Sequence, residues 1–121
     1  MVTSFFLDHL PPSTNSLYTT GAHGRRILVK DGRAYKQYVV ASAMASFRGQ
    51  ELEQRSHWRV ALEFHMGRAT YNRRDLNNMD KLIVDGIAEA MGVDDRYLQE
   101  LVLRKLLVEA EDTGVLVTIW I

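Results

Sequence analysis

Acidic, amide and lysine side chains are concentrated in one stretch, residues 73–95. They are Asp75, Asn77, Asn78, Asp80, Lys81, Asp85, Asp94 and Asp95. Carboxylates gathered at one point repel one another unless a divalent cation neutralises them, and hard oxygen ligands suit Mg²⁺ or Mn²⁺. Such an ion can polarise a phosphoryl oxygen and generate a hydroxide nucleophile, while a nearby lysine stabilises the developing charge. The stretch therefore indicates a divalent-metal site suited to phosphoryl chemistry.

The same residues also have structural interpretations, and the spacing alone does not exclude them. These are a helix cap for Asp75, Asn77 or Asn78, an i,i+4 ion pair for Lys81 with Asp85, and a turn for Asp94 and Asp95. A calcium EF-hand does not fit. Counting from Asp75, the sixth position is Asp80 rather than Gly, and the twelfth is Gly86 rather than Glu.

The element that would position most of these side chains is a helix predicted over residues 76–91, which ends before Gly92. On it, Asn78, Lys81 and Asp85 share one polar face. A helix of ~16 residues is ~24 Å long. Asp75 can then meet the 94–95 pair only if the helix is shorter than its pattern, or if the following strand runs back along it.

Apolar alternation and turn residues predict the remaining elements. They are strands at 5–9, 27–29, 57–66, 101–108 and 115–121, and a second helix at 33–47 between an Asp31-Gly32 turn and a Gly49 stop. One face of the 57–66 strand carries Trp58, Val60, Leu62, Phe64 and Met66. The order is β-β-α-β-α-β-β and several neighbours resemble hairpins, which favours a single α+β domain with a mixed β-sheet and two main helices.

Composition excludes several classes of protein. The chain has 121 residues, enough for one domain with its own core. It has no cysteine, which rules out disulfides, thiolate zinc sites, iron–sulfur clusters and a cysteine nucleophile, and suits a reducing cytoplasm. No apolar run reaches the ~18–20 residues that span a bilayer. The N-terminus lacks a basic segment, so no signal peptide is expected.

The net charge is zero, but its distribution along the chain is uneven. Residues 1–74 hold 11 Lys and Arg against 5 Asp and Glu, whereas residues 75–121 hold 4 against 10. This split allows for a basic surface beside an acidic one without establishing nucleic-acid binding. The candidates for phosphate contacts are Arg25, Arg26, Lys30, Arg33, Lys36, Arg73 and Arg74.

Three separated motifs resemble the RusA family of Holliday junction resolvases, endonucleases common in phages and prophages. The family pattern is Arg-Asp-x-Asp-Asn-x-x-Lys, a further Asp four residues on, and an Asp-Asp pair beyond a turn. The corresponding segment here is RRDLNNMDKLIVDGIAEAMGVDD. An earlier Pro-Pro-Ser-x-Asn motif corresponds to PPSTNSLY, which contains Asn15. The closing strands correspond to LVLRKLLVEAEDTGVLVTIWI.

The resemblance implies site residues one by one. The first metal-binding Asp falls on Asp75, and the last acid falls on Asp94 or, preferentially, Asp95. The family's asparagine, lysine and helix aspartate fall on Asn78, Lys81 and Asp85. The second catalytic Asp falls on Asn77, whose amide brings no negative charge to a metal. Asp80, three residues further on, could compensate.

The resemblance further implies a cytoplasmic, Mg²⁺-dependent homodimer, with Mn²⁺ as an alternative ion, whose two sites each nick one strand of branched DNA. The strands containing Trp58 and Trp120 offer apolar surface for pairing. Two alternatives stay open. Asn77 could leave a protein that binds junctions without cutting them, or the chain could be a dimeric interaction module with no role on nucleic acid.

Overall fold

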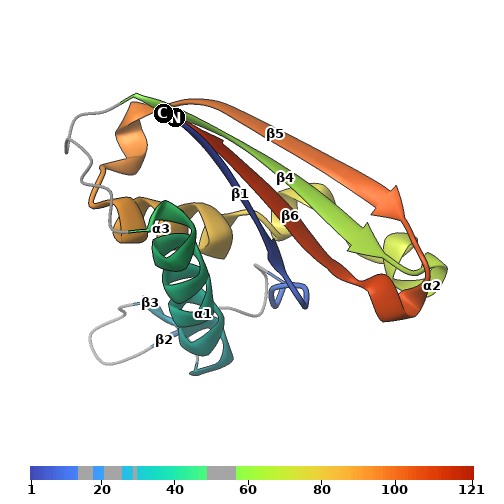
Figure 1. Cartoon of the computed structure of the whole chain (residues 1–121). Helices are drawn as coiled ribbons and strands as arrows, with labels where there is room; N and C mark the ends of the chain where they lie inside the picture. Colours follow the sequence, from blue (N-terminus) through green and yellow to red (C-terminus); the bar gives the residue numbers. More distant parts are fainter. Residues whose placement is uncertain (14–17, 21–25, 29, 49–56) are drawn as a thin grey trace.

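The computed structural model describes residues 1–13, 18–20, 26–28, 30–48 and 57–121, with the backbone alone at 18–20 and 26–28. Four strands form the main sheet in the order β1-β6-β4-β5. Their bounds are Val2–Leu7 for β1, Trp58–Met66 for β4, Leu98–Leu107 for β5 and Gly114–Trp120 for β6. In Figure 1 the sheet lies above the helices, and both chain ends lie at one corner.

The sheet is mixed, as predicted. β4 pairs in parallel with β5 and antiparallel with β6, and β6 pairs antiparallel with β1. The hairpin expectation is wrong for β5 and β6, because β4 lies between them. Within the described part of the chain, the consecutive strands that pair antiparallel are β2 (Tyr18–Thr20) and β3 (Arg26–Leu28), whereas the consecutive β4 and β5 pair in parallel.

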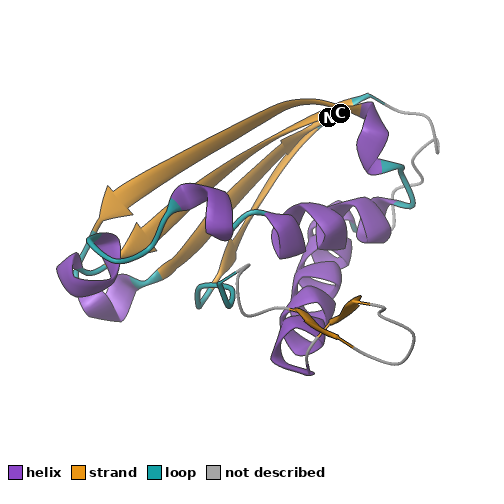
Figure 2. Cartoon of the chain, turned by 180° about the vertical axis from the view of Figure 1, so that it is seen from behind, coloured by secondary structure: helices purple, strands orange, loops and turns teal. Residues whose placement is uncertain are grey.

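One face of the sheet is the core face, and β4 contributes its centre. The five predicted inward residues are all buried, namely Trp58, Val60, Leu62, Phe64 and Met66. Figure 2 shows the helices gathered on a single side of the sheet. Trp58 is only 1% exposed, so it cannot supply the pairing surface expected of it. Trp120 is half-buried, and its register partner on β4 is Arg59, which belongs to the opposite face.

Two helices cover the core face and pack on each other: α1 (Lys30–Phe47) and α3 (Lys81–Met91). A Cβ at Gly86 of α3 would lie 2.8 Å from the Val39 side chain of α1, so glycine permits the close approach. The predicted Asp31-Gly32 turn is wrong, because both residues lie in the first turn of α1. An acidic residue is favourable there beside the positive end of the helix dipole. The expected stop at Gly49 lies outside the described residues.

The helix predicted over 76–91 is shorter than its pattern. Leu76–Asn78 form a 3₁₀ turn (η3), Met79 leaves the helical region at φ −124°, and α3 begins only at Lys81. Consecutive asparagines favour such a break, because their side chains compete with the backbone for hydrogen bonds. The end of α3 agrees with the prediction, with Gly92 in the left-handed conformation at φ 66°.

The chain then runs back beside α3. A second 3₁₀ turn, η4 (Asp95–Tyr97), contacts α3, and β5 follows directly from Leu98 and contacts η3. This return was one of the two arrangements that the sequence allowed for bringing the acids at 75 and 94–95 closer together. The 11 residues of α3 span about 16 Å. Both conditions therefore hold: a shorter helix and a returning strand.

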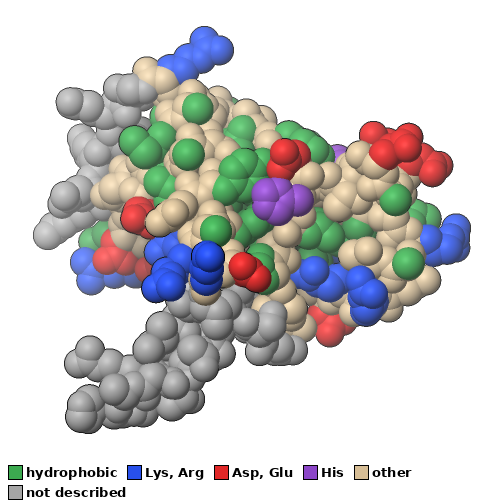
Figure 3. All heavy atoms as spheres, turned by 90° about the horizontal axis from the view of Figure 1, so that it is seen from below, with side chains coloured by type: hydrophobic (Ala, Val, Ile, Leu, Met, Phe, Trp, Pro, Cys, Tyr) green, Lys and Arg blue, Asp and Glu red, His purple; other side chains and the backbone are tan. Residues whose placement is uncertain are grey.

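On the face of the molecule seen from below (Figure 3), the charged side chains of the described residues are mixed rather than separated by sign. In the view from below, Lys and Arg side chains form several separate groups with acidic side chains between them (Figure 3). The uneven charge of the two halves of the sequence therefore does not produce one continuous basic face in this view. Among the described residues, no helix has the length and apolar character needed to cross a bilayer.

Candidate acidic pocket and its surroundings

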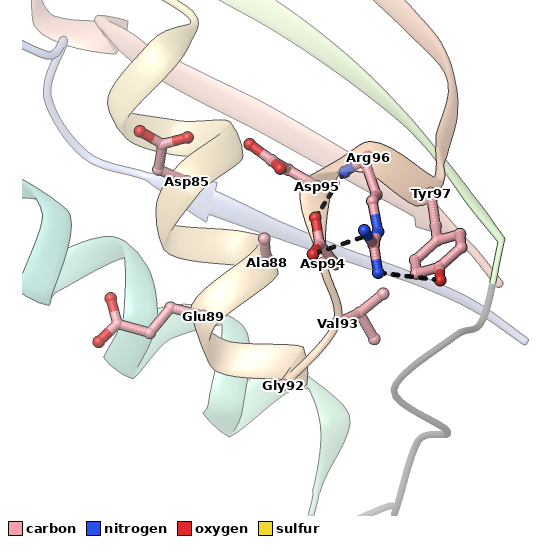
Figure 4. Close-up of a pocket in the computed structure, with 9 residues that line it drawn as sticks. All are labelled: Asp85, Ala88, Glu89, Gly92, Val93, Asp94, Asp95, Arg96 and Tyr97. Atoms are coloured by element: carbon pink, nitrogen blue, oxygen red, sulfur yellow. Dashed lines mark hydrogen bonds and ion pairs between the residues drawn. The ribbon is translucent and has the colours of Figure 1, made fainter.

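A pocket of about 590 Å³ lies where the end of α3 turns into η4. Its lining residues are Asp85, Ala88, Glu89, Gly92, Val93, Asp94, Asp95, Arg96 and Tyr97. Figure 4 shows α3 as one wall and η4 as the other. The left-handed Gly92 turns the chain so that the two walls face each other. Four of the nine lining residues are acidic, so the pocket is a concentrated source of carboxylate oxygens.

Asp85 and Asp95 are the two acids best placed to act together. The Asp95 carboxylate extends toward α3 on the side of Asp85 (Figure 4). Asp85 Oδ2 lies 3.3 Å from Lys81 Nζ, one helical turn earlier. The predicted i,i+4 pair is therefore present, and it joins Lys81 to an acid that lines the pocket.

Asp94 has a structural role as well as a place in the pocket. Its Oδ1 accepts a 3.0 Å hydrogen bond from the Arg96 backbone N–H, and its Oδ2 lies 3.4 Å from the Arg96 guanidinium. The backbone hydrogen bond from Arg96 is the main cause that lowers the pKa of Asp94 below its usual value. The predicted turn role of the Asp94-Asp95 pair is thus confirmed for Asp94, which caps η4. Asp95 extends its carboxylate toward α3 (Figure 4).

The residues of the earlier part of the motif lie outside this pocket. Asp75 is exposed at the start of η3, and its side chain makes no capping hydrogen bond. Asn77 is exposed and Asn78 half-buried within η3. Asp80 precedes α3, also without a capping bond. Because η3 and α3 are separate, Asp80 does not share a continuous helix face with Asn77.

Lys105 fixes the segment that leads into Asp75, a role that sequence reasoning missed. Its ammonium donates hydrogen bonds to the backbone carbonyls of Tyr71 and, at 2.7 Å, of Arg74, and it lies 4.3 Å from the centre of the Tyr71 ring. Lys105 pairs in register with the buried Phe64. The sequence held one signal for this role, because Lys105 stands at an inward-facing position of an apolar strand.

The predicted DNA-contacting residues have different surroundings. Lys30 and Arg33 are exposed on α1, and Arg73 is exposed in the turn before Asp75. Lys36 Nζ lies 3.3 Å from Glu89 of the pocket wall. Arg74 is half-buried and donates a 2.7 Å hydrogen bond to the Pro11 carbonyl, and burial lowers its pKa below the usual value. Arg25 and Asn15 lie outside the described residues, as does the side chain of Arg26.

The donor chemistry of the pocket suits a hard divalent ion. Carboxylate oxygens are the ligands that Mg²⁺ and Mn²⁺ prefer, and Asp85 and Asp95 supply them from two adjoining elements. The described residues contain no group of three or more His, Asp or Glu side chains in metal-binding proximity. Two protein carboxylates are nevertheless a usual number for Mg²⁺, which retains several waters and takes further oxygens from substrate phosphates.

A small α+β domain with several carboxylates at one pocket, one of them paired with a lysine, is equipped for phosphoryl chemistry. Comparison with protein families matches residues 9–120 to the family described as endodeoxyribonuclease RusA. The match covers nearly all of the chain, so this protein belongs to the RusA family, and the resemblance seen in its motifs is confirmed. A search of curated proteins found no match.

Membership gives the general activity. It implies an endodeoxyribonuclease that acts on Holliday junctions, and the family binds branched DNA. RusA-family nucleases depend on divalent metal in general.

Proposed function

We propose that this protein resolves four-way DNA junctions by paired nicks in a Mg²⁺-dependent reaction. One observation carries the proposal within the family: Asp85 and Asp95, which are separated in the family motif, line a single pocket, and Asp85 is paired with Lys81. Mn²⁺ is expected to substitute for Mg²⁺, because it binds the same oxygen ligands.

Each proposed residue has a distinct task. Asp95 and Asp85 would hold the ion, with Asp94 fixing the η4 turn that presents Asp95. When bound, the ion would polarise the scissile phosphate and lower the pKa of a bound water. Lys81 would stabilise negative charge on the phosphate or the leaving oxygen. The family pattern adds Asp75 as a ligand, and Lys105 holds the segment before it.

The proposed DNA contacts come from basic residues on and around α1. Lys30 and Arg33 project from the first turn of α1, and Arg73 lies just before Asp75. Arg25 and Arg26 precede these residues in the sequence. Such residues would hold the phosphate backbone without reading its sequence.

We also propose a homodimer that acts on DNA in the bacterial cytoplasm. One chain offers one acidic pocket, whereas resolving a two-fold symmetric junction takes two cuts. A second copy supplies the second site in the matching orientation. The further proposal that the gene belongs to a phage or prophage rests on the distribution of the family.

A second function, junction binding without cleavage, is favoured by one specific feature. Asn77 stands where the family has a catalytic Asp, so the site has one negative charge fewer. A divalent ion would then be held less tightly. The protein would still bind junctions but would no longer cleave them.

An assay with a labelled four-way junction distinguishes the two functions. With Mg²⁺ present, the protein should produce symmetric nicks, which are lost with a chelator and in Asp95→Asn. The matched control is Asp112→Asn, an exposed acid outside the pocket, which should cut normally. A mobility shift without cutting at millimolar Mg²⁺ and Mn²⁺ would favour the binding function. The absence of both would overturn the proposal.

A further inference from the structure

Among the described strands, β5 is an edge of the sheet, and apolar side chains are exposed on both of its faces. It ends the strand order, and Figure 1 shows it as the outermost strand. Leu101 and Leu107 are 38% and 46% exposed, and Val102 and Leu106 are 38% and 41% exposed. The register with β4 puts the first two on the core face and the other two on the opposite face. An edge strand of this kind is a template for pairing with another chain.

The other edge of the sheet lacks these properties. The exposed large side chains of β1, Val2 and Phe6, lie on one face only, and α1 packs along the strand. β1 also contains no charged residue that could set a register. β5, in contrast, carries an acid and a base on the same face, Glu100 and Arg104.

We propose that β5 pairs antiparallel with β5 of a second copy, about a two-fold axis at Val102. This inference rests on the proposed homodimer and identifies its interface. In an antiparallel pair, residues directly opposite each other point to the same face. A two-fold axis perpendicular to the sheet therefore places one residue opposite its own copy. The axis at Val102 places Glu100 opposite the partner's Arg104.

No other register of this symmetry brings those two charges together. Moving the axis by one residue moves Glu100 two positions along the partner strand, opposite the partner's Val102 or the partner's Leu106. With the axis at Val102, the Glu100 pairing occurs twice, because the interface is self-complementary. Within one chain, the Arg104 guanidinium also lies 3.5 Å from Glu63. Arg104 would then lie between two carboxylates. The paired segments would span residues 98–106 of each copy and cover Leu101 on one face and Val102 and Leu106 on the other.

The pairing also has a consequence for catalysis. A two-fold axis perpendicular to the sheet keeps the helix-covered faces of both copies on the same side. The two sheets become one continuous sheet with four strands from each copy. Both acidic pockets, which lie in the helical layer, then approach a single junction from the same side. This is the arrangement that two coordinated nicks require.

Single-cysteine cross-linking tests the register directly, because the chain contains no cysteine. Val102→Cys should form a disulfide-linked dimer on mild oxidation, since opposed Cα atoms lie ~4.5–5.5 Å apart. Glu100→Cys on the same strand is the matched control. Its two copies would lie about 13 Å apart along the strands, beyond disulfide reach. Efficient linking of Glu100→Cys, or none of Val102→Cys in a protein that sediments as a dimer, overturns the proposed interface.

Charge reversal gives an independent test by sedimentation. Glu100→Arg and Arg104→Glu should each raise the dimer dissociation constant by roughly tenfold or more, because like charges then face each other twice. Combining the two should recover much of the dimer affinity, whereas Glu111→Arg outside β5 should change nothing. If the double variant is weaker than either single one, the register is wrong. If the wild-type protein is a monomer at micromolar concentration, the dimer itself is wrong, while junction cleavage can still be tested separately.

Discussion

Asn77 stands where we expect the family pattern to have an aspartate, and its effect should be on charge rather than on the fold. It is exposed in η3, and Asp has nearly the same shape. We expect Asn77→Asp to raise metal affinity and cleavage rate together, by roughly tenfold, because a carboxylate near a divalent ion is worth on the order of 1 kcal/mol or more even when solvated. Isothermal titration with Mn²⁺ and single-turnover cleavage measure the two effects.

Two comparison variants sharpen the Asn77 experiment. Asp75→Asn should abolish cleavage and spare junction binding, since removing a negative charge near phosphate does not weaken attraction. If Asp80 compensates for Asn77, Asp80→Asn will be as damaging as Asp75→Asn, and Asn77→Asp will gain little. Should Asn77→Asp stay inactive in millimolar Mn²⁺, the non-cutting function becomes the better account.

Lys105 is expected to act on cleavage by positioning the segment before Asp75. Lys105→Met leaves the carbonyls of Tyr71 and Arg74 without their donor, which should cost about 1–3 kcal/mol of stability. Well below the melting temperature and with junction saturating, the cleavage rate should still fall at least several-fold while junction affinity is unchanged. Arg48→Met, at an exposed basic residue, is the control. A rate that matches wild type under these conditions would leave Lys105 with a purely structural role.

At the scale of elements, the contact between α1 and α3 depends on the absence of a side chain at Gly86. Gly86→Ala places a Cβ 2.8 Å from Val39 and 3.3 Å from the Lys36 carbonyl. Overpacking of this kind costs about 1–3 kcal/mol, which outweighs the ~1 kcal/mol gained in helix propensity. Thermal unfolding should show a lower melting temperature. Adding Val39→Ala should make the Gly86→Ala step less costly than it is in the wild-type background, and a strictly additive double variant would contradict the clash.

The sequence predicts helices and strands best where the apolar periodicity is regular and a residue that ends the element follows it. The alternation of β4 identified all five of its core residues, and Gly92 correctly marked the end of α3. The break between η3 and α3 was hidden, because the apolar spacing of Leu76 and Met79 continues that of the helix. Met79 is buried although the backbone is not helical there, so an apolar residue is needed at this position whether or not the helix continues.

Sequence patterns likewise predicted only part of the candidate site. Spacing on a helix correctly paired Lys81 with Asp85. It could not show that Asp85 and Asp95 share a pocket, because that depends on how η4 turns back against α3. Nor could it separate Asp94, which caps η4, from Asp95. The strand order that leaves β5 at an edge is likewise a property of long-range pairing, which local patterns do not determine.

At the scale of the whole molecule, DNA binding should be local and sensitive to salt. Replacing Lys30 and Arg33 together with Ala should weaken junction binding similarly for all sequences. It should also reduce the slope of log affinity against log salt by roughly 0.9 for each phosphate that the protein no longer neutralises. Arg48→Ala, at the opposite end of α1, serves as the control. An unchanged slope would remove Lys30 and Arg33 from the DNA-binding surface.

The most direct test of the account is cleavage of a supercoiled plasmid that extrudes a cruciform. Two coordinated nicks across the junction convert the plasmid to a linear form, whereas a single nick gives an open circle. We expect linear product that depends on Mg²⁺ or Mn²⁺, is absent in Asp95→Asn, and is not formed from a plasmid without the cruciform. Cleavage that persists in a chelator, or intact plasmid at protein concentrations that saturate the junction, would contradict a metal-dependent resolvase.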